Sequence, residues 1–151
     1  MKKAQRPIAF LVFGIYLVAL VYLLFFSDAY GRTEAYATYH YSLIPFREIR
    51  RYLFSSMDIR LKLINIGGNI LAFVPYGFLV PALFPKLRKW WIVMLLTALF
   101  SVCVEGIQLI FRIGACDVDD VILNTAGGLL GFLLLVLTDN IVKKNAEKKK
   151  V

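Results

Sequence analysis

Four long stretches of apolar residues alternate with shorter polar segments along the chain. Each stretch has about 20 residues, and a helix of that length crosses a hydrocarbon layer of roughly 30 Å. The pattern therefore predicts an all-α fold, an integral membrane bundle of four transmembrane helices. The predicted helices cover residues 8–27, 62–83, 90–112 and 120–142. Pro75 and Pro81 are expected to kink or break the second helix.

The segment between the first two predicted helices, residues 28–61, has a different pattern. Its stretch SLIPFREIRRYLF, residues 42–54, carries apolar residues near helical spacing with charged residues between them. That pattern is typical of an amphipathic helix lying in a membrane interface, and we expect one to begin after Pro45. The first apolar stretch is too long for the core of a signal peptide and no Ala-x-Ala site follows it, so we interpret it as an uncleaved span.

Composition and charge agree with a membrane protein. The 151 residues suffice for a single domain, residues 1–151, and a hydrophobic content of 60% excludes a soluble bundle with polar outer faces. The net charge of +8 lies at the ends of the apolar stretches, which indicates membrane topology and not nucleic acid binding. Eleven of the 18 lysines and arginines lie at the two termini and in the loop at 84–89. They predict a multi-pass protein of the cell membrane with both termini cytoplasmic and an extracytoplasmic segment 28–61.

Polar residues inside the predicted helices gather at one depth, near the outer membrane surface. On three helices they recur at a spacing that places them on one face. The set is Asn65 and Asn69; Glu105, Gln108 and Arg112; and Asp117, Asp120 and Asn124. A charged residue within a span costs roughly 2.5–3.5 kcal/mol, so such residues normally face a protein interior or a wet cavity. The spacing predicts an outward-facing polar pocket formed by these eight residues, which would bind a ligand.

Structural roles compete with this interpretation. Glu105 is either a ligand-binding or catalytic carboxylate or a structural one hydrogen-bonded to Asn69 or Asn124. Asp117 could be the N-cap of the last helix with Asp120 at its third position, whereas Asp119 should point elsewhere. Three carboxylates could hold a hard cation, but no histidine joins them, and we expect neither a metal nor another cofactor.

The glycines of the second and fourth predicted helices favour close helix packing. Gly127 and Gly131 form a small-xxx-small pair, and Gly67 and Gly68 are interpreted in the same way. Close approach of these two helices would bring their asparagines together. A glycine-rich fourth helix could also serve as the interface of a homodimer.

The segments NIGGNILAFVPYGFLVP and SVCVEGIQLIFRIGACDVDDVILNTAGGLLGF, with SLIPF before them, resemble the VanZ-like family over about residues 40–137. The matching positions are Pro45, Phe46, Asn65, Gly68, Asn69, Phe73, Pro75, Gly77, Ser101, Glu105, Gln108, Asp117, Asp120, Asn124, Gly127 and Gly131. Ser42 stands where family members often carry asparagine. Gly114 stands where many carry arginine, a charge that Arg112 could supply.

The resemblance implies a small membrane protein linked to teicoplanin resistance. It favours a protein that lowers susceptibility to teicoplanin-type lipoglycopeptides, with a pocket that binds membrane lipids, a cell-wall precursor lipid or the lipoglycopeptide itself. Arg112 and Arg47 would then face phosphate. Two alternatives remain open: an enzyme that modifies an envelope lipid or glycan with Glu105 and Asp120 as acid and base, and a lipid transporter that would need a homodimer.

Overall fold

The computed structural model describes residues 6–26 and 39–148. Residues 1–5, 27–38 and 149–151, which include parts of the predicted outer segment and of both termini, lie outside the described residues. Four helical segments are long and apolar enough to cross a membrane, so the predicted bundle is confirmed. They are α1 (Arg6–Phe26); a continuous segment from α3 (Ile59–Lys62) through a π-helical turn (Leu63–Gly67) to α4 (Gly68–Leu83); α5 (Trp90–Phe111); and α6 (Val118–Lys148).

The second span does not break at its prolines. Helix α4 contains both Pro75 and Pro81 and continues to Leu83. A broken helix would leave backbone groups without partners in a medium that offers no water, which favours the continuous form. The irregular backbone lies earlier, in the π-helical turn Leu63–Gly67.

Helices α4 and α6 pack backbone against backbone. A Cβ atom added at Gly127 would overlap the carbonyl oxygen of Ile70, and one at Gly131 would overlap that of Val74. Gly77 of α4 lies in the same way against the backbone of α6. The predicted close packing is thus confirmed for Gly127 and Gly131, whereas a Cβ at Gly67 would meet open space.

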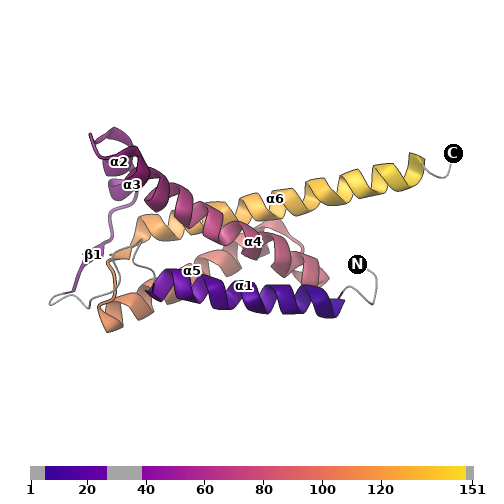
Figure 1. Cartoon of the computed structure of the whole chain (residues 1–151), viewed down its shortest axis with the longest axis horizontal. Coiled ribbons are helices and arrows are strands. Elements are labelled where there is room, and N and C mark those ends of the chain that lie inside the picture. Colours follow the sequence, from indigo (N-terminus) through magenta and orange to yellow (C-terminus); the bar gives the residue numbers. More distant parts are fainter. Residues whose placement is uncertain (1–5, 27–38, 149–151) are drawn as a thin grey trace.

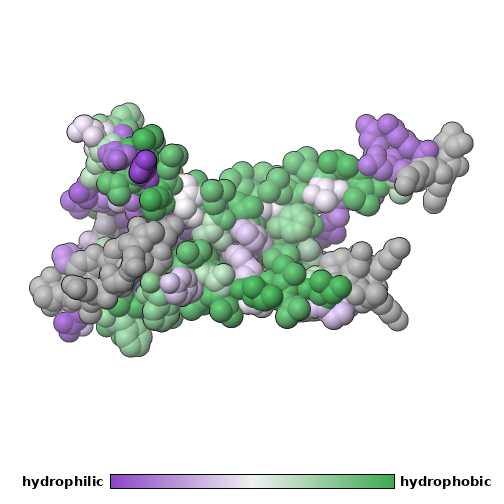
Figure 2. Space-filling model, in the orientation of Figure 1, coloured by the Kyte–Doolittle hydropathy of each residue, from purple (hydrophilic) through white to green (hydrophobic). Residues whose placement is uncertain are grey.

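The core joins three of the spans. Leu20 and Leu24 of α1 are buried against Phe73 of α4 and Val104 of α5. The hydroxyl of Tyr16 in α1 donates a hydrogen bond of 2.8 Å to the carbonyl of Ala72 in α4. The surface over the length of the helices is apolar, and hydrophilic residues concentrate at the two ends (Figure 2).

One end of the bundle carries the remaining elements, and we call it the polar end. Here lie the short helix α2 (Arg47–Phe54) and a two-residue parallel pairing of β1 (Tyr41–Ser42) with β2 (Cys116–Asp117). The predicted amphipathic helix is therefore present and begins two residues after Pro45. The start of α1 and the end of α6 lie together at the opposite end (Figure 1). There Arg88, just beyond the 3-10 turn Pro85–Leu87, forms an ion pair with Asp139.

Candidate functional site

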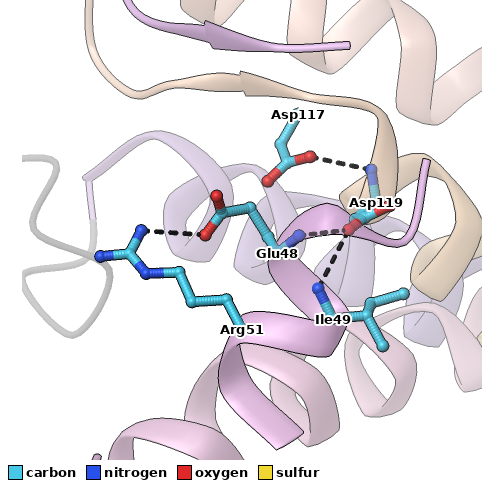
Figure 3. Close-up of polar contacts among 5 residues, drawn as sticks. All are labelled: Glu48, Ile49, Arg51, Asp117 and Asp119. Carbon is cyan, nitrogen blue, oxygen red and sulfur yellow. Dashed lines mark hydrogen bonds and ion pairs between the residues drawn. The ribbon is translucent and has the colours of Figure 1, made fainter. Parts of the chain in front are cut away.

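Asp119 joins the start of α6 to the start of α2. Its Oδ1 accepts a hydrogen bond of 2.5 Å from the backbone N–H of Phe46. Its Oδ2 accepts bonds of 2.8 and 3.0 Å from the N–H groups of Glu48 and Ile49 (Figure 3). Asp119 is 1% exposed. A buried carboxylate thus serves as the N-terminal cap of a helix some 70 positions away in the sequence.

The spacing predicted only that Asp119 points away from the stripe of Asp120 and Asn124, and it did not predict this role. Local spacing treats Asp119 only as an acid in the first turn of α6. A signal was nevertheless available, because the residue before α2 is Phe46, which has no side-chain oxygen to cap the helix. A helix start of that kind needs an acceptor from elsewhere in the chain.

Asp117 is the N-cap of α6. Its Oδ1 accepts a hydrogen bond of 2.9 Å from the N–H of Asp119, the second residue of that helix (Figure 3). The N–H of Asp117 itself donates to Oε2 of Glu105, at 2.8 Å. The proposed cap role of Asp117 is confirmed, and Glu105 supports it from α5.

The Glu105 carboxylate is buried, with 4% exposure, and the two asparagines considered as its partners make bonds to other residues. The amide of Asn69 donates to Oδ1 of Asp120 at 2.5 Å, and the amide of Asn124 donates to the hydroxyl of Ser101 at 2.8 Å. The Asn69–Asp120 bond links α4 to α6 at the end of the glycine contact. Close packing of these helices therefore does bring their polar residues together.

A buried polar face of α5 continues this network toward the other spans. Thr97, Ser101, Glu105 and Gln108 are all buried on it. Nε2 of Gln108 donates a hydrogen bond of 2.7 Å to the carbonyl of Leu24 in α1. Oε1 of Gln108 is buried and has no hydrogen-bond partner among the described residues. Sequence spacing identified Glu105 and Gln108 and missed Thr97.

Two of the predicted site residues lie apart from the network. Asn65 donates to the carbonyl of Leu61 in its own helix, at 2.8 Å. Helix α5 ends at Phe111, and Arg112 has a left-handed backbone with φ of 57°, so the helical face shared with Glu105 does not extend to it. The exposed Arg112 guanidinium lies 4.8 Å from the ring centre of Tyr39.

Burial and neighbouring carboxylates shift two pKa values at the polar end. Burial raises the pKa of Asp117 from 3.8 to about 6, assisted by the nearby charges of Asp119 and Glu48 and opposed by the Asp119 N–H. Burial, and then the charges of Glu105, Asp117 and Asp120, raises the pKa of the Cys116 thiol. A raised thiol pKa argues against a thiolate nucleophile here. Among residues 6–26 and 39–148, no group of three or more His, Cys, Asp and Glu side chains is arranged to hold a metal ion.

The arrangement divides the site into a buried frame and a more open part. Glu105, Gln108, Asn69, Asn124 and Asp119 are each at most 4% exposed and are held by helix-to-helix or helix-to-loop bonds. Asp117 and Asp120 are only partly buried and lie next to α2. The frame can hold the open residues and α2 in fixed positions.

Four apolar spans with a buried acid–amide network at one end define a small multi-pass membrane protein with a polar site at that end. The chain belongs to the VanZ/LLP1 family, whose pattern it matches over residues 13–139. It is 32% identical over 144 residues to Protein VanZ of Enterococcus faecium, an alignment that covers 91% of this chain and 77% of the relative. No solved structure matches it.

Proposed function

We propose that this VanZ-family membrane protein lowers susceptibility to teicoplanin-type lipoglycopeptides by binding an envelope lipid or precursor at its polar end. The observation that carries the proposal is the network around Glu105, Asp117 and Asp120. It buries carboxylates at one end of the bundle, where their burial costs free energy. The similarity to Protein VanZ, over 91% of this chain, supports extending the family's link to teicoplanin resistance to this protein.

The proposed orientation places the polar end outside the cell. Lysines and arginines are most frequent at the two termini and in the loop at 84–89, and such residues favour the cytoplasmic side. The start of α1 and the end of α6 lie together, opposite α2 (Figure 1). An outward polar end suits a ligand made or displayed at the outer membrane surface.

The buried frame and the open residues have separate tasks in this proposal. Glu105, Asn69 and Asn124 fix the helix ends, and the partly buried Asp117 and Asp120 face the ligand together with Arg112. A substitution in the frame then reduces protection by displacing the open residues. A substitution at Asp120 reduces protection by removing a contact.

The test is teicoplanin susceptibility of a susceptible Gram-positive strain that expresses the full chain. Wild type should protect the strain and Glu105→Gln should not, at equal membrane abundance. Glu147→Gln makes the same chemical change at an exposed position near the end of α6 and should protect like wild type. Equal protection by wild type and Glu105→Gln, or no protection by wild type relative to an empty vector, would refute the proposal.

A further inference from the structure

A groove of about 330 Å³ lies at the start of α2, beside the residues that Asp119 holds. Its lining combines three apolar residues with two arginines: Ile44, Pro45, Phe46, Arg47 and Arg50. Its volume is at the lower end of the range for small-molecule sites, which suits a headgroup-sized ligand.

The contacts of these two arginines differ from those of their neighbour on α2. Within residues 6–26 and 39–148, the side chains of Arg47 and Arg50 make no hydrogen bond or ion pair. Arg51 on the same helix differs, because its guanidinium pairs with Glu48 at 3.1 Å (Figure 3). Two unpaired guanidinium groups at positions i and i+3 present ten hydrogen-bond donors toward one side of the helix.

The backbone that carries these arginines is held in place. Phe46 has a left-handed conformation with φ of 63°, which is costly for a residue with a side chain. Its N–H binds Asp119, and the N–H of Arg47 donates to the carbonyl of Ile44 at 3.3 Å. The Asp119 carboxylate therefore determines where the groove and its arginines lie. Because Asp119 already occupies the N–H groups at the start of α2, a ligand anion must bind the side chains.

We propose that this groove binds the phosphate of an anionic membrane lipid through Arg47 and Arg50, and that Asp119 is the positioning residue. Ile44 and Phe46, which are 59% and 55% exposed, would contact the apolar part of the same lipid. Charge complementarity and location both favour this occupant. Phosphates lie at the ends of membrane spans, where basic residues beside exposed apolar ones bind anionic lipids. Anionic lipid is thus the ligand class proposed for the polar end, and the role of this binding in the cell rests on the proposed function.

The experiment measures lipid binding by the full chain in detergent, by native mass spectrometry with phosphatidylglycerol or the zwitterionic phosphatidylcholine as probes. Wild type should prefer phosphatidylglycerol. The double variant Arg47→Gln/Arg50→Gln should bind it about 30-fold more weakly, because each basic side chain near an anionic lipid contributes about 1 kcal/mol. The matched control Arg51→Gln/Arg60→Gln removes the same charge from the same segment and should retain the preference.

Asp119→Asn tests the positioning role. It should weaken phosphatidylglycerol binding several-fold and leave phosphatidylcholine binding unchanged, a selective loss that general loosening of the bundle would not produce. Because Arg47 and Arg50 are exposed, their double variant should fold normally even if Asp119→Asn does not.

Three results would overturn the inference: no preference in wild type, equal losses in the double variant and its control, or full competition by inorganic phosphate, which would indicate a site for free anions. These results are distinct from failure of the proposed function. A protein that binds phosphatidylglycerol through the two arginines but gives no protection refutes the resistance role alone.

Discussion

Replacing Asp119 with asparagine should release the start of α2 and leave the four spans in place. The substitution keeps the size of the side chain but removes its charge. It also replaces one of the two accepting oxygens with an NH₂ group, so the oxygen that remains can accept from Phe46 or from Glu48 and Ile49, but not from all three N–H groups. In wild type, Glu48 and Ile49 are the second and third residues of α2. Amides at these positions have no partner within their own helix.

The size of the effect follows from the N–H groups that lose their acceptor and from the charge that is lost on the oxygen that remains. A hydrogen bond to a charged group contributes about 1.5–3 kcal/mol. The three bonds share one carboxylate, and Phe46 is 55% exposed, so water replaces part of the loss. We expect local destabilisation of about 2–4 kcal/mol, which corresponds to about 30- to 1,000-fold faster amide exchange.

Hydrogen exchange resolved to single amides in detergent micelles is the assay. Glu48 and Ile49 should be protected in wild type and exchange faster in Asp119→Asn, whether they lose their acceptor or keep a neutral one, with α5 unchanged. Asp58→Asn is a matched control, because Asp58 caps α3 through the N–H of Arg60. The reasoning is refuted if the Glu48 and Ile49 amides exchange at the unprotected rate in wild type, or equally slowly in both proteins.

The remaining predictions concern helix packing, pH and the Asn69–Asp120 bond. Gly127→Ala should lower the unfolding free energy by about 1–3 kcal/mol in denaturant titration, because the added Cβ overlaps α4. Gly67→Ala faces open space and should leave the unfolding free energy unchanged, and equal effects of the two substitutions would contradict the packing argument. The pKa of Asp117 in the folded protein, about 6, exceeds its ordinary value of 3.8. The stability that protonated Asp117 contributes to the fold is therefore complete below about pH 4 and is lost as pH rises through about 6. The thermal midpoint should fall over that interval, and Asp117→Asn should flatten the profile; an unchanged slope would count against this assignment. A double-mutant cycle with Asn69→Ala and Asp120→Ala should give a coupling of about 0.6–1.7 kcal/mol, and additive losses would indicate that the bond contributes nothing.

The spans and their packing could be predicted because they depend on local sequence. Apolar length alone identifies a membrane helix. The small residues around Gly127 allow two backbones to approach. The partner of Asn69 was not predicted, because Asp120 lies 51 positions further along the chain.

The rest of the site depends on contacts that spacing does not encode. Arg112 was expected on the face of Glu105 because the helix was assumed to continue, but the chain turns into a left-handed conformation at that residue. The role of Asp119 depends on α2 being placed beside the start of α6. Sequence reasoning thus found most of the buried frame and missed the residue that attaches α2 to it.

The bond between Asn69 and Asp120 also has a consequence for biosynthesis. The two residues are 51 positions apart, with α5 made between them. At translation rates of about 5–20 residues per second, Asp120 is added about 3–10 s after Asn69. During that time the second span lacks its native partner for a polar amide and has an uncovered glycine face. The newly made helix α4 must therefore be held by the insertion machinery, by water or by α1 until α6 arrives, and truncated chains that end before Asp120 should be the preferred substrates of membrane quality-control proteases.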